Sequence, residues 1–246
     1  MKQALRIVQD FIKSAAEKHL SVYAAGSAFF VILSIVPMFM LLNFLLPFTG
    51  LTEKNLLDAL LPLFPSATIP FWEAVITQVN SGSKRMLPVT FIFAAWSSGR
   101  GMLSLIRGLN GIYGTSEHRG YFRLRVISSF YTIILLAGLV FVLVISVFGQ
   151  SRLRFVPAAG ILGIIFTLLY TYVPDRKLSI KNQYRWGFAA AIGCTIFSYC
   201  FSVYVDYYND FSGYGSINII IIIMLWLYFM MYILLYGAFA GSYKIY

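Results

Sequence analysis

The stretch INIIIIIMLWLYFMMYILLYGAFAG, residues 217–241, decides the fold, because it contains no charged side chain over 25 residues. A transmembrane helix needs about 20 consecutive apolar residues, so this segment is long enough to cross a bilayer. The whole chain has the same character: 59% of its 246 residues are hydrophobic and 11% are charged. A soluble domain carries about 25% charged residues. This composition excludes an ordinary soluble enzyme.

Five more apolar stretches precede this segment, at 22–48, 86–113, 126–149, 157–173 and 186–206. Each is long enough to span a hydrocarbon core, although 157–173 is at the short limit. The sequence therefore predicts an all-α fold, a polytopic transmembrane helix bundle of six spans that forms one integral membrane domain over residues 1–246.

Lysine and arginine are concentrated in alternate connections between these stretches. With the N-terminus inside the cell, twelve of the 19 basic residues lie in cytoplasmic segments and five in external ones. Because cytoplasmic loops carry the excess of Lys and Arg, this distribution predicts that both termini are cytoplasmic. The net charge of +10 then indicates anionic membrane lipids as partners, and not nucleic acid.

Two further segments flank the first span. Residues 1–20 have apolar side chains at helical spacing, which predicts an amphipathic N-terminal helix. That helix either lies on the inner leaflet or packs under the bundle. Residues 51–85 form the longest external connection, where prolines at 62, 65 and 70 limit any helix to a short one.

Residues that serve familiar enzyme chemistry are scarce. Cys194 and Cys200 are six residues apart in an apolar helix, which points them in different directions and excludes a disulfide between them. His19 and His118 have no partner at metal-ligand spacing, and no nucleotide-binding or hydrolase motif is present. We expect no catalytic residue, no metal site and no cofactor, and hence not an enzyme.

The strongest local signal lies in WSSGRGMLSLIRGLNGIY, residues 96–113. Arg100 and Arg107 are seven residues apart, which places them on one helix face, and Asn110 extends that face. An arginine deep in hydrocarbon costs about 2.5–3.5 kcal/mol, so Arg100 is expected to face the bundle interior or a wet cavity. It either binds an anionic phosphate or carboxylate group or makes a structural bond to carbonyls or an acid. Arg107 either contributes to the same anion site or snorkels to the inner interface.

Small residues recur on the same helix, at Ser97, Gly101, Ser104 and Gly108. This small-xxx-small spacing predicts close approach of a second helix.

Two other sets of residues are candidates for a binding site. Pro37, which follows Ser34 in the first span, removes a helical hydrogen bond and produces either a substrate-lining break or a plain kink. Asp206 and Asp210 lie in an external turn that holds no basic residue. They either bind a cation or pair with Arg100, or they belong to a solvated turn beside an aromatic belt.

Four segments resemble the YihY/BrkB family of polytopic inner-membrane proteins, in order and spacing along nearly the whole chain. They are AAGSAFF and LSIVP at 24–37, residues 96–113, YVPDRK at 172–177 with Gly187, and YGS at 214–216 with LWLY at 225–228 and Gly-Ala at 237–238. The family often carries an acid where this chain has Phe239. The resemblance implies six spans, cytoplasmic termini and a multi-pass protein of the bacterial cytoplasmic (inner) membrane.

Family members have been labelled ribonuclease BN and have been linked to serum resistance and envelope lipid export. The first hypothesis for this chain is a transporter or flippase-like protein for an anionic lipid or other amphiphile. The alternative is a non-transporting scaffold or envelope-assembly factor. A ribonuclease is the weakest hypothesis, because no metal-binding His/Asp cluster is present. Self-association into a homo-oligomer is left open.

Overall fold

The computed structural model describes residues 13–49, 54, 68–69, 72–74, 87–115, 119–131, 155–176, 178–207 and 216–243. Every regular element within these ranges is helical, as the sequence predicts. The long helices are α2 (Leu20–Thr49), α5 (Leu87–Ile112), α7 (Phe155–Tyr172), α8 (Ile180–Tyr207) and α9 (Ser216–Tyr243). A shorter helix covers residues 121–131. Residues 132–149, which make up most of the predicted third span, lie outside the described ranges.

The helix boundaries follow the predicted apolar stretches within a few residues, with one larger difference. The fifth stretch was predicted to begin at 186, but α8 begins at Ile180. Polar side chains occupy its first turns, and Lys181, Asn182 and Arg185 are exposed there. The hydropathy pattern marks only the part of a helix that faces apolar surroundings, so it missed this polar beginning.

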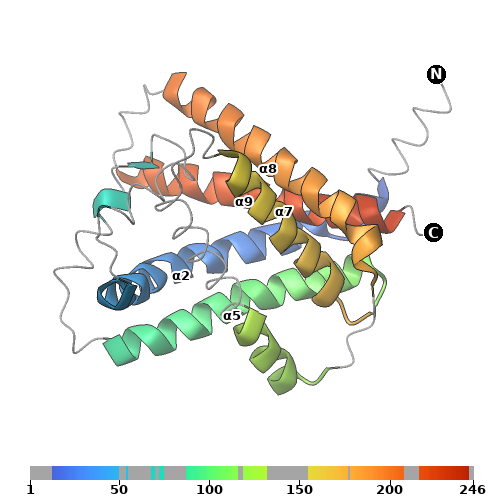
Figure 1. Ribbon diagram of the computed structural model, residues 1–246, viewed down its shortest axis with the longest axis horizontal. Helices are drawn as coiled ribbons and strands as arrows, with labels where there is room; N and C mark the ends of the chain where they lie inside the picture. Colours follow the sequence, from blue (N-terminus) through green and yellow to red (C-terminus); the bar gives the residue numbers. More distant parts are fainter. Residues whose placement is uncertain are drawn as a thin grey trace.

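The helices pack as two pairs that α9 joins. Helix α2 packs on α5 and α7 packs on α8, while α9 contacts α8, α2 and α5 (Figure 1). Glycines make the closest approaches. A carbon added at Gly187 of α8 would lie 2.7 Å from the backbone nitrogen of Thr167, and one at Gly237 of α9 would lie 2.7 Å from the Ala190 side chain. Small residues thus let α7, α8 and α9 approach one another closely.

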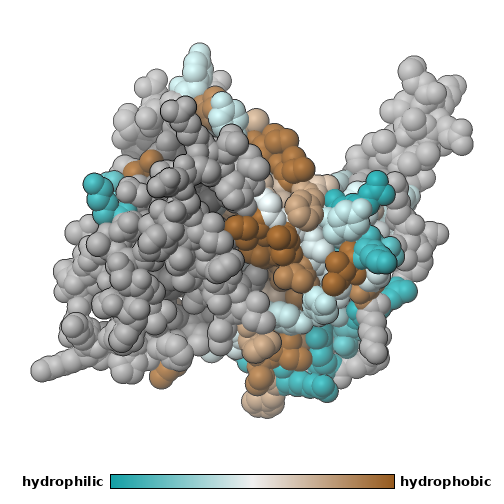
Figure 2. Space-filling model, viewed as in Figure 1, coloured by the Kyte–Doolittle hydropathy of each residue, from teal (hydrophilic) through white to brown (hydrophobic). Residues whose placement is uncertain are grey.

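One end of the bundle collects the start of α2, the start of α8 and the final turns of α5, α7 and α9 (Figure 1). Packed neighbours therefore run in opposite directions: α2 against α5 and α9, and α8 against α7 and α9. Figure 2 shows hydrophilic residues gathered at this end and hydrophobic residues on the flank formed by α7 and α8. Along α8 the exposed hydrophobic side chains form a stripe that includes Phe188, Ile192, Ile196, Tyr199 and Val203.

Within the described part of the chain, two helical segments are long and apolar enough to cross a membrane, Ile180–Val205 and Ile219–Tyr243. Only 28% and 33% of their most apolar windows are buried inside the protein. A core helix of a soluble protein would be mostly buried, so exposed apolar surface of this extent favours contact with lipid. Shorter apolar helical segments occur at Leu20–Ser34 and Ala159–Tyr172.

The segment before α2 packs against the bundle where the structure describes it. Residues 13–17 are helical, and the chain then turns at His19, whose φ is 53°. Ala15 and Leu20 are buried in the core, and Lys18 Nζ donates a 2.8 Å hydrogen bond to the carbonyl of Gly111, near the end of α5. Over residues 13–20 these contacts favour the packed position over one on the leaflet surface. Residues 1–12 lie outside the described ranges.

Helix α2 runs without interruption through Pro37. Its first half is drawn lengthwise in Figure 1 and its far end nearly end-on, so the axis bends along the helix. A proline inside a helix removes one hydrogen bond and bends the axis. The observed helix corresponds to the predicted kink, and not to a broken span.

The predicted external connection at 51–85 is described at a few residues only. Residues 72–74 are helical, and Trp72 is fully buried. Its Nε1 donates a 3.0 Å hydrogen bond to the Thr68 hydroxyl, one helical turn earlier. This part of the connection therefore packs into the protein.

Candidate functional site

Helix α5 carries the predicted arginines, and its small residues face α2. A carbon added at Gly101 would lie 3.4 Å from the Phe30 Cβ atom, and one at Gly108 would lie 3.0 Å from the Tyr23 Cβ atom. The Ser104 hydroxyl donates a 3.2 Å hydrogen bond to the Tyr23 carbonyl on α2. The predicted close approach of a second helix is confirmed, and α2 is that helix.

The side chain of Arg100 is exposed. Its guanidinium carbon lies 4.6 Å from the centre of the Trp96 ring and 5.7 Å from that of Phe30. The prediction that Arg100 faces the bundle interior is therefore wrong. The reason is local: the indole one turn earlier offers the cation a polarisable face, so the arginine need not turn inward.

Arg107 is also exposed, so the two arginines lie on the same side of α5, as their spacing predicts. Asn110 does not extend that side, which corrects the prediction. It is buried, with an exposed fraction of 3%, and its Oδ1 accepts a 2.8 Å hydrogen bond from the backbone N–H of Asp175. Three residues turn a helix by about 300°, so Asn110 lies about 60° around the helix from Arg107, where it meets the connection between α7 and α8.

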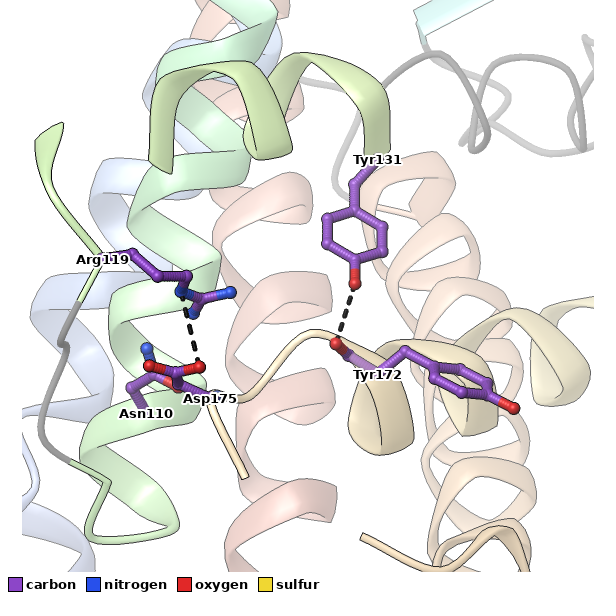
Figure 3. A network of polar contacts seen from close by, with 5 residues as sticks. All are labelled: Asn110, Arg119, Tyr131, Tyr172 and Asp175. Atoms are coloured by element: carbon purple, nitrogen blue, oxygen red, sulfur yellow. Dashed lines mark hydrogen bonds and ion pairs between the residues drawn. The ribbon is translucent and has the colours of Figure 1, made fainter. Parts of the chain in front are cut away.

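Asp175 is the centre of a polar cluster that sequence analysis did not identify (Figure 3). Its backbone is held by Asn110 of α5, and its carboxylate lies 3.8 Å from Nε of Arg119. Nearby, the Tyr131 hydroxyl donates a 2.8 Å hydrogen bond to the Tyr172 carbonyl at the end of α7. The cluster thus fastens the connection between α7 and α8 to the end of α5.

Two buried tyrosines add contacts between helices. The Tyr113 hydroxyl donates a 2.9 Å hydrogen bond to Oε1 of Gln183 on α8. The Tyr170 hydroxyl of α7 donates a 2.6 Å hydrogen bond to the Leu234 carbonyl of α9. No local motif marks these residues. Gln183 precedes residue 186, where the fifth apolar stretch was predicted to begin, so no pattern in the sequence indicated that its side chain is buried.

The other predicted site residues either lie apart from Arg100 and Arg107 or fall outside the residues that the structure describes. Ser34 is buried, and its hydroxyl donates a 2.7 Å hydrogen bond to the Val31 carbonyl in its own helix. The side chains of Pro37 and Asp206 are outside the described set, although their backbones belong to α2 and α8. Asp210 lies outside the described residues entirely.

A second arginine reaches Trp96 from another helix. Arg125, on the helix at 121–131, donates a 2.5 Å hydrogen bond from Nη2 to the Trp96 carbonyl, and its guanidinium carbon lies 6.0 Å from the ring centre. A carbon added at Gly99 would lie 3.3 Å from the Ser129 hydroxyl and 3.6 Å from that guanidinium, the second an ordinary contact distance. In the sequence, Arg125 is one of the twelve basic residues that are expected in the cytoplasmic segments.

Within the described part of the chain, neither Arg100 nor Arg125 is paired with an acid. The ion pair found there joins Arg119 and Asp175. The Nη1 atom of Arg125 is buried and has no hydrogen-bond partner among the described residues. Cys194 and Cys200 are free thiols, as predicted. Three metal-ligating side chains do not gather at any one place in the described ranges.

The order of these features along the chain matches a known family. Residues 11–240 match the family described as Virulence factor BrkB. The chain belongs to this family. The resemblance noted in the sequence is thereby confirmed, and it makes the chain an integral membrane protein of the BrkB type.

Curated relatives cover most of the chain. It is 29% identical over 237 residues to a ribonuclease-like protein, YfkH, of Bacillus subtilis (strain 168), covering 87% of this chain and 86% of that protein. It is 26% identical over 246 residues to a UPF0761 membrane protein of Haemophilus influenzae (strain 86-028NP), covering 93% and 91%. No solved structure matches the chain. The first of these two names mentions ribonuclease, and the second describes a membrane protein.

Proposed function

We propose that this BrkB protein is a multi-pass protein of the bacterial cytoplasmic membrane that binds an anionic lipid and moves it, as a transporter or flippase-like protein. The observation that carries the proposal is the exposed guanidinium of Arg100 in the middle of α5, stacked on Trp96. An arginine exposed at membrane depth is unfavourable in hydrocarbon alone. A lipid phosphate would compensate that charge and accept its hydrogen bonds.

Two features support six spans with both termini in the cytoplasm. Helix α2 begins and α9 finishes at one end of the bundle (Figure 1). The hydrophilic residues of Figure 2 gather at that same end, where the predicted cytoplasmic connections carry Arg119, Arg176 and Lys181. Cytoplasmic ends carry such a basic excess.

The alternative, a non-transporting envelope-assembly scaffold, is favoured by the hydrogen bonds that tie the helix ends together at Asn110, Tyr113 and Tyr170. A scaffold needs this rigidity but no exposed cation. The ribonuclease activity named for one relative gains no support from the described residues, which bring no set of metal-ligating side chains together.

Lipid binding by the purified protein tests the proposal. Dioleoylphosphatidylglycerol is titrated against the wild type, Arg100→Gln and Arg123→Gln, and bound lipid is counted by native mass spectrometry. Arg123 is an exposed arginine on the neighbouring helix and serves as the control. We expect Arg100→Gln to weaken binding roughly tenfold or more, as for loss of a hydrogen bond to a charged group, and Arg123→Gln to leave it unchanged. Equal binding by both variants would exclude the role of Arg100.

Movement of the lipid needs a separate measurement. Proteoliposomes that contain fluorescent phosphatidylglycerol report its transfer between leaflets when an impermeant reductant quenches the outer leaflet. A transporter moves the lipid and slows in Arg100→Gln. A protein that binds the lipid and leaves its leaflet distribution unchanged is a scaffold.

A further inference from the structure

Arg100 and Arg125 come from different helices and meet the same indole. Arg100 stacks on the Trp96 ring at 4.6 Å, and Arg125 lies 6.0 Å from the same ring while it donates to the Trp96 carbonyl. Arg100 contacts the Trp96 ring, whereas Arg125 is held by the Trp96 carbonyl and lies near the ring. Trp96 thus gathers two positive charges in one place.

This arrangement leaves positive charge uncompensated within the described part of the chain. No acidic side chain pairs with either arginine there, and Nη1 of Arg125 is buried without a hydrogen-bond partner. An anion that accepts hydrogen bonds from both guanidinium groups would compensate their charge and satisfy the unpaired donor.

The surroundings of the pair favour an anion that carries hydrocarbon. On α5, the described exposed side chains before Arg100 include the apolar residues Val89, Ile92 and Phe93. On the neighbouring helix, Val126 and Phe130 are exposed. Acyl chains could cover these side chains while the headgroup occupies the arginines, whereas a free phosphate ion would leave them uncovered.

We infer that Arg100 and Arg125 form a two-arginine site that binds the phosphate of one anionic phospholipid, with Trp96 as the platform that positions both guanidinium groups. The inference rests on the proposed function and extends it, because it names a second arginine and assigns both to one phosphate. Arginine suits this task, since its planar fork donates two parallel hydrogen bonds to phosphate oxygens.

A double-mutant cycle tests the site on the full chain. Arg100→Gln, Arg125→Gln, the double variant and Arg123→Gln are titrated with dioleoylphosphatidylglycerol, with dioleoylphosphatidylcholine and with inorganic phosphate. Each single variant at the site is expected to lose roughly tenfold in affinity for phosphatidylglycerol. The double variant is expected to lose much less than the product of the two losses, because both arginines hold one group. Arg123→Gln is expected to bind as the wild type does.

Arg125 also donates to the Trp96 carbonyl, so Arg125→Gln can disturb folding. Arg125→Lys retains the charge but loses the planar fork, and a thermal melt in detergent verifies that each variant is folded. A folded Arg125→Lys protein with weakened phosphatidylglycerol binding supports the site. Wild-type affinity in both folded Arg125 variants overturns it.

The outcomes separate this inference from the proposed function. If Arg100→Gln alone weakens binding, the proposed function stands and the two-arginine site is wrong. If the wild type binds phosphatidylcholine as tightly as phosphatidylglycerol, both are wrong. If inorganic phosphate competes with phosphatidylglycerol at equal concentration, the site selects a free anion and the lipid occupant is excluded.

Discussion

The two halves of α5 differ sharply in their surroundings. Before Gly101, the exposed side chains include Val89, Ile92, Phe93, Trp96 and Arg100. From Gly101 onward most positions are buried, and Ile106 and Leu109 are completely so. The buried half also carries the bonds of Ser104 to α2 and of Asn110 to Asp175. One continuous helix therefore serves as a packing element at one end and as an exposed surface at the other.

This difference separates the residues that hold the bundle from those that are free to meet a ligand. Removing a buried contact in the second half leaves a cavity, a clash or an unpaired polar group. Arg100 is exposed and holds no other helix except through the Phe30 ring. Stability and lipid binding should therefore respond to substitutions in different halves of the same helix.

The largest expected effect is overpacking in the buried half. In Gly108→Leu, the first added carbon already lies 3.0 Å from Tyr23 and 3.2 Å from Leu235, so the larger side chain must push α2 or α9 away. We expect the free energy of unfolding to fall by about 1–3 kcal/mol or more, which is measured as a lower melting temperature in detergent. Gly111→Leu is the control, because an added carbon there meets only Tyr23 at 3.9 Å. Equal melting temperatures for the two variants would show that Gly108 does not limit the packing.

A smaller loss is expected when the polar cluster is opened. Asn110→Ala leaves the partly buried N–H of Asp175 without the Oδ1 acceptor, at a cost of about 1–3 kcal/mol. Asn182→Ala, at an exposed position of α8, is the matched control. Melting in detergent measures both, and phosphatidylglycerol binding by folded Asn110→Ala should equal that of the wild type. Loss of lipid binding in that folded variant would show that the two halves are not independent.

The smallest effect on stability is expected at Arg100. Arg100→Gln removes the cation–π contacts with Trp96 and Phe30, each worth about 0.5–1 kcal/mol at an exposed site, so its melting temperature should stay closer to that of the wild type than the melting temperature of Asn110→Ala does. Thermal melts in detergent measure this effect, and the melting temperature of Arg123→Gln serves as the reference. A drop as large as that of Asn110→Ala would make Arg100 a structural residue and favour the scaffold.

The helices were predictable because their signals are local. Apolar runs marked the long helices, and the spacing of Gly101, Ser104 and Gly108 marked the face that meets α2. The polar beginning of α8 was missed, because side chains such as Lys181 continue a helix without contributing to an apolar run. A bend at Pro37 was expected, but its alternative, a broken span, needed the structure to exclude it.

The site was only half predictable, for a different reason. Arg100 was singled out as a charge within an apolar helix, and its role in binding stays a prediction. Of its two expected surroundings the bundle interior was wrong, although Trp96 one turn earlier was a visible signal for an exposed stacked pair. Arg125 and Asp175 could not be selected, because their contacts join segments 29 and 65 residues apart in the chain. Such contacts depend on how the helices cross, which no local pattern encodes.

The central claim is that the exposed half of α5 binds an anionic lipid through Arg100 and Arg125. A structure of the full chain in nanodiscs of phosphatidylglycerol tests it most directly. The account predicts density for one lipid phosphate in contact with both guanidinium groups beside Trp96, with acyl chains along Ile92 and Phe93. Both arginines paired with protein carbonyls or acids, with no lipid beside Trp96, would contradict it.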